Sequence, residues 1–335
     1  MPFSMRFLST ACPLAAVAVL TSAAALGEPL PDPDNGPISG VYNFVDSTEG
    51  ADLVADGKFA FSLSSITSSH SVLEERGAES LIFDGETTRL EWRLRYGLSE
   101  RIELGVELPW VWHSPGRLDS LIDTWHDVFG LPDGFRDDLP EDVLLYRYTD
   151  SSGTRLDYRD GSSGIGDLRL QAALRLGSGD KHRRALRFGL VLPTGDAYKP
   201  HGSDALSVSA GIAGDIDALG EGSRFSAFYR AHLSWIDEPA LLPDRYREWI
   251  GHVAGGLGYR LNRTVDLRAQ IAMRTATHDS ELLVLGEPSI ALTFGGNIRL
   301  GKRYTLSLAV GEDIKVNSSP DVSFMLALHF TPDDD

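Results

Sequence analysis

The sequence predicts an all-β protein, a transmembrane antiparallel β-barrel of about twelve strands with a helical external loop. Three observations favour this class. Segments of alternating apolar and polar residues recur along most of the chain, the links between them alternate in length, and aromatic residues gather at the segment ends. A strand sends successive side chains to opposite faces, so each segment has one apolar and one polar face. Apolar faces toward lipid and polar faces toward a lumen are what a membrane barrel requires.

The N-terminus has the features of a secretory signal. Arg6 precedes an apolar run at 7–20, and the small residues of 21–25 follow it. We expect cleavage after Ala25, which makes 1–25 a signal peptide. The one cysteine, Cys12, lies inside the apolar run, so the mature chain is expected to lack thiol chemistry. A lipoprotein interpretation of Cys12 is disfavoured because most of the apolar run follows it.

The composition limits the remaining classes. Residues 26–57 are rich in Pro, Asp and Gly without sustained periodicity, which predicts an extended periplasmic lead-in. The barrel is expected over 58–330, and an acidic tail at 331–335 follows it. The formal net charge of -17 argues against a nucleic-acid partner. Beyond the signal, the chain has no apolar run long enough for a spanning helix.

The clearest hairpin lies at 88–110. Apolar residues alternate with Arg and Glu from Leu90 to Tyr96 and again from Ile102 to Trp110, and the link at 97–100 predicts a turn. A soluble sandwich would not require a ladder of Arg and Glu on the other face of its strands. The predicted strands span 58–68, 88–96, 101–110, 166–176, 186–192, 206–212, 225–235, 249–261, 265–273, 290–300, 304–310 and 322–330.

The links indicate how such a barrel sits in the membrane. Links after even-numbered strands are short and turn-like, whereas links after odd-numbered strands are longer. The longer links span 69–80, 111–163, 193–204, 236–248, 275–288 and 311–321. Short periplasmic turns and long external loops alternate in this way in outer-membrane barrels. The even strand number places both termini in the periplasm, and the expected location is the outer membrane of a Gram-negative bacterium.

Aromatic residues predict two girdles at the membrane interfaces. The external girdle comprises Trp110, Trp235 and Trp249. The periplasmic girdle comprises Tyr96, Tyr259, Tyr304 and Phe330, together with Phe59 and Phe225. Aromatic residues favour strands in general, but that preference would not sort them to the strand ends.

The polar faces predict an ionic lumen. Its expected lining residues are Arg89, Glu91, Arg93, Arg95, Arg101, Glu103, Glu107, Asp167, Arg169, Arg175, Arg187, Arg230, Asp266, Arg268, Arg274 and Arg299. These side chains either pair and close the bore, giving a structural or interaction barrel, or line a narrow wet channel. Arg outnumbers carboxylates in this set, so a channel would favour small anionic or organic solutes.

Within the link at 111–163 the apolar period changes to that of an amphipathic helix at 118–129, which Gly130 and Pro132 would end. Such a helix either caps the barrel as a plug or acts as a gate or ligand contact. The residues expected to act there are Asp119, Ile122, Trp125, His126, Phe129 and Arg136. Asp119 and His126 share one helical face, but two ligands do not make a metal site, and no cofactor is expected.

The same stretch resembles a bacterial family catalogued as domain of unknown function 3187, predicted outer-membrane barrels. The resemblance rests on the D-x-x-I-x-x-x-H pattern from Asp119 to His126, on Gly130-Leu131-Pro132 and on Arg136. The stretches GIGDLRL and LPTGD also match, and similar stretches occur in barrels related to aromatic-degradation pathways. The resemblance implies a barrel and carries no activity. For an outer-membrane barrel the expected partners are outer-membrane lipid and lipopolysaccharide, the barrel-assembly machinery and a possible small solute.

An outer-membrane acyl hydrolase is the enzymatic alternative. His113 beside Ser114, His126, His201 near Ser203, and His278 near Ser280 are the candidate residues. The sequence has no nucleophile elbow and no HExxH motif to fix their geometry. Isolated histidines in polar loops are usually structural, so we favour a protein that is not an enzyme.

Overall fold

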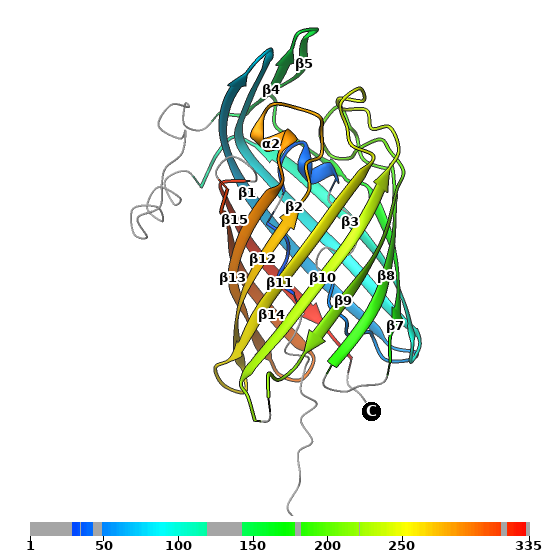
Figure 1. Ribbon diagram of the computed structural model, residues 1–335. Coiled ribbons are helices and arrows are strands. Elements are labelled where there is room, and N and C mark those ends of the chain that lie inside the picture. The colour runs from blue at the N-terminus through cyan, green and yellow to red at the C-terminus, as the bar shows by residue number, and fades with distance from the viewer. Residues whose placement is uncertain are drawn as a thin grey trace, which may run out of the picture.

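The computed structural model of the protein describes residues 29–33, 35–42, 49–118, 143–177, 182–220, 222–315 and 320–332. The strands of the described residues form one fifteen-stranded sheet (Figure 1). The first strand, β1 (Phe59–Arg76), pairs with the last, β15 (Val322–Phe330), from Phe61 opposite Phe330 to Ser69 opposite Val322. This pairing closes the barrel, and the predicted class and strand number are confirmed.

Twelve of the fifteen strands form the barrel wall. Between β1 and β15 the wall comprises β2 (Glu79–Ser99), β3 (Ile102–Ser114), β7 (Leu168–Arg175), β8 (His182–Leu192), β9 (Ser207–Ile216), β10 (Phe225–Ile236), β11 (Trp249–Arg260), β12 (Val265–Arg274), β13 (Ser289–Leu300) and β14 (Tyr304–Asp313). Each wall strand pairs antiparallel with the next one, so every wall strand has a partner on both sides.

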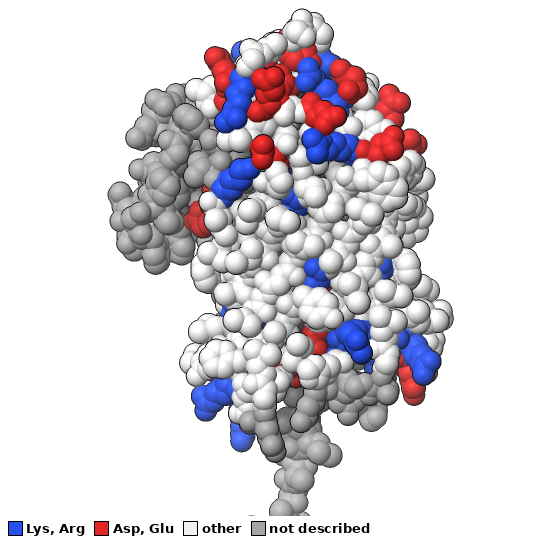
Figure 2. Space-filling view, viewed as in Figure 1, with Lys and Arg blue, Asp and Glu red and all other residues white. Residues whose placement is uncertain are grey.

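The two faces of the wall differ as the alternation predicts. On β2, Trp92 and Leu94 are exposed on the outside, whereas Glu91 and Arg93 are buried on the inside. Figure 2 shows, on the face in view, a broad band of mostly uncharged surface, with a dense group of charged side chains at the end that carries the long loops and a smaller group at the opposite end. An apolar exterior with an ionic interior is the arrangement of a membrane barrel and the reverse of a soluble protein.

Aromatic pairs mark one rim of the barrel. Rings from neighbouring strands lie 4.5 Å apart for Phe59 and Tyr96, and 5.4 Å apart for Tyr304 and Phe330. Phe225 and Tyr259 make a third such pair at 5.0 Å. At the opposite ends of β10 and β11, Trp235 lies directly across from Trp249. Among the described residues, no helix is long and apolar enough to cross a membrane.

Beyond the wall, the structure corrects two predicted loops. Residues 69–80 are not a loop, because β1 and β2 continue as a hairpin to Arg76 and Glu79. The link predicted at 111–163 begins with the end of β3 and then contains β4 (Leu145–Asp150), β5 (Gly153–Tyr158) and the start of β6 (Ser162–Ile165), which pair with β2, with β4 and with β3 in turn. On β4 the side chains of Tyr146 and Tyr148 are buried in alternation with half-buried neighbours, so the strand still has one buried face, but its charged and aromatic residues lack the apolar alternation of a lipid-facing strand.

Two short helices are the only helical elements among the described residues, η1 (Ser39–Tyr42) and α2 (Leu283–Gly286). The helix predicted at 118–129 lies outside the described residues except for Leu118. The backbone N–H of Leu118 donates to Glu86 at 2.6 Å.

Candidate functional site

The lumen is lined by the predicted charged residues. Twelve of the sixteen are buried there: Arg89, Glu91, Arg93, Glu103, Glu107, Asp167, Arg169, Arg187, Arg230, Asp266, Arg268 and Arg274. Arg95, Arg175 and Arg299 are half-buried, and Arg101 is exposed in the turn between β2 and β3. Uncharged lumen residues escaped prediction because they carry no charge pattern; they include Gln171, His232, His252, Gln270 and Asn297.

A network of ion pairs joins β2, β3 and β7 on the inner face of the wall. Glu107 lies directly across from Arg93 and also accepts from Arg169, so one carboxylate binds two guanidinium groups. Arg169 reaches Glu91 as well, at 3.3 Å. Glu103 is 3.5 Å from both Arg95 and Arg187. Buried charges are tolerated in proteins when they are paired in this way.

The lumen also contains the chain's own N-terminal region. We call residues 29–33, 35–42 and 49–56 the inner segment. Near the middle of the wall, Leu30 of this segment contacts Arg230 and Gln270. Ile38 lies beneath the loops. The chain leaves the lumen at the rim, where the N–H of Gly57 donates to the carbonyl oxygen of Gly97. A Cβ on Gly97 would lie 2.1 Å from the carbonyl oxygen of Ala55, so this exit requires glycine. The lead-in predicted outside the barrel at 26–57 is therefore corrected for the described residues.

Three wall arginines bind the inner segment through its carbonyl oxygens. Arg89 donates to Gly40 O at 2.8 Å and to the Asn35 side chain at 3.1 Å. Arg187 donates to Gly50 O at 2.7 Å, and Arg230 donates to Leu30 O at 3.2 Å. Each guanidinium group thus donates to a backbone carbonyl oxygen instead of to water, and this hydrogen bond lowers the free-energy cost of burying the arginine.

Carboxylates complete the attachment in both directions. Two belong to the inner segment: Asp32 pairs with His252, and Glu49 pairs with Arg93 and with Arg95, the latter at 2.9 Å. Wall carboxylates accept from segment amides in return, Asp215 from Ala51 N and Glu103 from Val54 N, each at 2.7 Å. The excess of Arg over carboxylate in the predicted lumen was the sequence signal that further acidic partners were missing.

Small side chains on the wall make room for the inner segment. Ala51 and Leu53 pack against Ala173, Ala185 and Ala213, which face inward from β7, β8 and β9. Leu30 packs with Ile66, Ala309 and Met325 on the other side. Alanine at these positions leaves a bore wide enough for a peptide, so wall and segment are complementary in shape as well as in charge.

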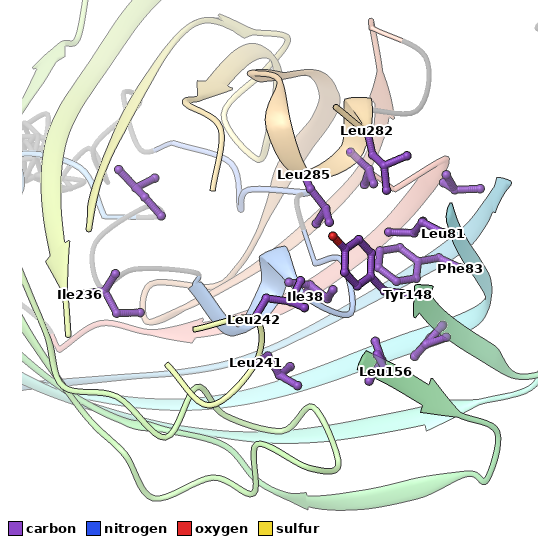
Figure 3. Close-up of a cluster of buried hydrophobic side chains, with 14 of the residues drawn as sticks. Ile38, Leu81, Phe83, Tyr148, Leu156, Ile236, Leu241, Leu242, Leu282 and Leu285 are labelled. Atoms are coloured by element: carbon purple, nitrogen blue, oxygen red, sulfur yellow. The ribbon is translucent and has the colours of Figure 1, made fainter. Parts of the chain in front are cut away.

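An apolar cluster lies over the inner segment at the loop end of the barrel, and we call it the mouth cluster (Figure 3). Ile38 of the inner segment joins side chains from β2, β4, β5 and the loops after β10 and β12. The labelled members are Ile38, Leu81, Phe83, Tyr148, Leu156, Ile236, Leu241, Leu242, Leu282 and Leu285. Each fully buried member contributes about 1.5–3 kcal/mol. The described residues therefore cover the mouth without the predicted helix.

The motif stretches that carry the family resemblance fold one loop over the mouth. Asp167 of GIGDLRL accepts from the backbone N–H groups of Thr194 and Gly195 at 3.1 and 2.9 Å. Its other oxygen accepts from Ser203 N at 2.8 Å and Ser203 Oγ at 3.0 Å. Asp167 is thus a loop anchor more than a lining residue, and it positions His201 against His113, with ring centroids 5.7 Å apart.

Replacing Asp167 with alanine should release this loop. The substitution leaves the buried N–H of Ser203 and the less buried N–H groups of Thr194 and Gly195 without their acceptor, at a cost of about 3 kcal/mol, so transient opening should rise roughly a hundredfold. Chymotrypsin should then cut after Tyr198, which is 82% exposed, about a hundred times faster. Asp204→Asn, an exposed carboxylate change in the same loop, is the control and should leave the rate unchanged. Equal rates in the two variants would contradict the anchoring role.

The predicted Ser–His pairs are not formed among the described residues. Ser203 donates to Asp167, and Ser280 donates to Glu79. Instead, Nε2 of His201 lies 2.8 Å from Oγ of Ser162. Burial lowers the pKa of His201. In the described part of the chain, no carboxylate hydrogen-bonds this imidazole, so the pair lacks the group that would orient a catalytic histidine.

Asp119, Ile122, Trp125, His126, Phe129 and Arg136 all lie outside the described residues. Groups of three or more His, Cys, Asp or Glu that could hold a metal ion are absent from the described residues.

A family model described as "Protein of unknown function (DUF3187)" matches residues 4–331. The chain belongs to this family. The DUF3187 resemblance inferred from the sequence is thereby confirmed, and it extends over almost the whole chain. No curated protein matches the sequence.

Among solved structures, the COG4313 outer membrane channel from Pseudomonas putida F1 is 14% identical, with a TM-score of 0.56 over 86% of this chain and 100% of that chain. The KdgM porin in complex with disordered oligogalacturonate is 7% identical, with a TM-score of 0.44 over 82% of this chain and 100% of that chain. The toluene transporter TbuX from Ralstonia pickettii is 13% identical, with a TM-score of 0.43 over 88% of this chain and 98% of that chain. The first similarity shows that this DUF3187 protein has the barrel fold of an outer-membrane channel.

Proposed function

We propose that this DUF3187 protein is a passive outer-membrane channel for small anionic or organic solutes, and that its inner segment and mouth cluster close it in this conformation. The observation that carries the proposal is how the inner segment is held. Outside its exit at Gly97, the described segment contacts the wall through side chains and adds no strand to the sheet. The wall is hydrogen-bonded to itself all the way round, so the segment can leave without opening the barrel.

The width of the bore supports a channel. Barrels of about eight strands are filled by their own side chains, whereas wider ones leave room for a ligand or water. Here that room is taken by a peptide bound to arginines of the wall. Once the segment is displaced, Arg89, Arg187 and Arg230 would face water and give the lumen a positive potential. An anionic solute is the passenger that this potential favours.

A closed structural barrel is the second candidate, because the ion network and mouth cluster are complete among the described residues. In that alternative, the lumen serves stability and the exterior or loops serve a partner. For both candidates we propose that outer-membrane lipid and lipopolysaccharide surround the exterior and that the barrel-assembly machinery inserts the protein. Gating by the helix predicted at 118–129 is proposed for the channel alone.

Planar bilayers distinguish the candidates. The purified full-length protein should show a small conductance, and under a potassium chloride gradient its reversal potential should have the sign of an anion-selective pore. Phospholipid deacylation should be undetectable in the same preparation. Cation selectivity would contradict the arginine-lined path, and a silent bilayer for both the wild type and a barrel without the inner segment would favour the structural candidate.

A further inference from the structure

Arginines outnumber carboxylates among the ion pairs that join the wall strands in this part of the lumen. These pairs join four guanidinium groups to three carboxylates, namely Arg93, Arg95, Arg169, Arg187, Glu91, Glu103 and Glu107. Glu49 of the inner segment supplies the fourth carboxylate. In this conformation the protein therefore provides a carboxylate to this arginine-rich part of the lumen from its own chain.

The position of Glu49 is that of a bound carboxylate. Its Oε1 accepts from Arg93 and its Oε2 lies 2.9 Å from Arg95, so each oxygen has its own guanidinium. The group lies between two small cavities, one of about 50 Å³ bordered by Arg93 and Arg95, and one of about 10 Å³ bordered by Arg187 and Arg230. Glu49 lines both of them.

Arg230 gives a second, independent indication of a ligand. Its side chain is almost fully buried, with the residue 3% exposed, yet only Nη2 has a hydrogen bond, to Leu30 O. Among the described residues, no partner lies within hydrogen-bond distance of Nε or Nη1. Unmet donors of a buried guanidinium are costly, so this site has binding capacity for an anion that the inner segment leaves unused.

We propose that Arg93 and Arg95, with Arg187 and Arg230 behind them, form a binding site for a small monocarboxylate, and that Glu49 occupies it as an internal substitute. The inference rests on the proposed channel, since the solute would take the site when the inner segment withdraws. Glu103 and Glu107 remain in the wall and repel a second negative charge, so the site discriminates against dianions such as hydrogen phosphate. Solute and segment then compete for one site.

The test uses Glu49→Ala, which removes the equivalent of one acetate from the site. Acetate is titrated by calorimetry into the full-length variant and the wild type in detergent. We expect the variant to bind acetate at least roughly tenfold more tightly, because a charge-assisted bond to arginine contributes more than a neutral one. Acetamide, which has the same shape without the charge, should not bind. Asp56→Ala, an exposed carboxylate change in the same segment, should behave as wild type.

A second substitution locates the site. Adding Arg95→Gln to Glu49→Ala should abolish acetate binding, and Arg95→Lys should give an intermediate affinity because it keeps the charge but not the planar fork. Heat-modifiable migration on gels verifies that each variant is folded. Equal acetate affinity in Glu49→Ala and wild type, binding that survives Arg95→Gln, or phosphate binding as tight as acetate binding would each overturn the proposal.

Because binding is measured without a membrane, the two proposals fail separately. Acetate binding with the expected dependence on Glu49 and Arg95, in a barrel that never conducts, supports the site and contradicts the channel. Conductance without such binding supports the channel and overturns the site.

Discussion

A variant that lacks residues 29–54 should conduct on the order of a hundredfold more than the wild type in planar bilayers. The inner segment is held by charged contacts such as Glu49 with Arg95 and Asp32 with His252. Two such contacts of about 1.5–3 kcal/mol each shift an open–closed equilibrium by a factor of a hundred or more. Removing the segment also empties the space that Ala51 and Leu53 fill against the wall alanines, so water can enter along the ionic face.

The same variant should keep its barrel. Wall strands pair with one another from β1 round to β15, so heat-modifiable migration should be retained. A matched control replaces residues 29–54 by a Gly/Ser segment of equal length, which preserves the connection but has no anchoring side chains. This control should conduct nearly as well as the deletion. Wild-type conductance in both folded variants would mean that the mouth cluster or the wall side chains close the bore by themselves.

The wall could be predicted because its determinants are local. Alternation of apolar and polar residues depends only on near neighbours in sequence and on the lipid outside, so all twelve wall strands were recognisable. The prediction failed where lipid no longer contacts the strand. Along 69–87 the strands β1 and β2 pack against β4 and the loops, and neighbouring residues there are apolar together, as in Val72-Leu73 and 81–83, so the sequence does not show the period of two that the strands have.

The inner segment could not be predicted from local pattern. Its contacts join positions far apart, Asn35 with Thr87 and Asp32 with His252, and its backbone has no repeating period. A Pro-rich stretch without periodicity has the same appearance whether it is solvated or enclosed. The surplus of arginine on the lumen faces was interpreted as a preference for anionic solutes; it could also have indicated missing acidic partners, but charge balance alone does not say which part of the chain supplies them.

The loop motifs were recognisable by resemblance, yet their role came from geometry. Asp167 has the same alternation as a lumen residue, so sequence grouped it with the lining arginines. Its four hydrogen bonds to the loop at 194–203 depend on how that loop turns back over β7. Turn geometry of this kind is set by tertiary contacts that no short pattern encodes.

Replacing Glu107 with alanine should destabilise the closed barrel by about 3–5 kcal/mol, because it removes one partner from a buried ion network. Glu107 is 1% exposed and binds both Arg93 and Arg169, so its loss leaves two guanidinium groups side by side without the charge between them. The midpoint temperature of heat-modifiable migration, or a urea titration in detergent, measures the loss. Glu100→Ala, in the exposed turn after β2, is the control and should change stability by less than about 0.5 kcal/mol.

Combining Glu107→Ala with the deletion of residues 29–54 tests whether the emptied lumen is wet. If water fills the bore, Arg93 and Arg169 become hydrated, and the cost of Glu107→Ala should fall to about 1 kcal/mol or less, the range of a solvated ion pair. If the bore collapses and stays dry, Arg93 loses both of its carboxylates, and the cost should rise above that in the intact barrel. The sign of this coupling in a double-mutant cycle therefore separates an aqueous channel from a closed structural lumen without any measurement of current.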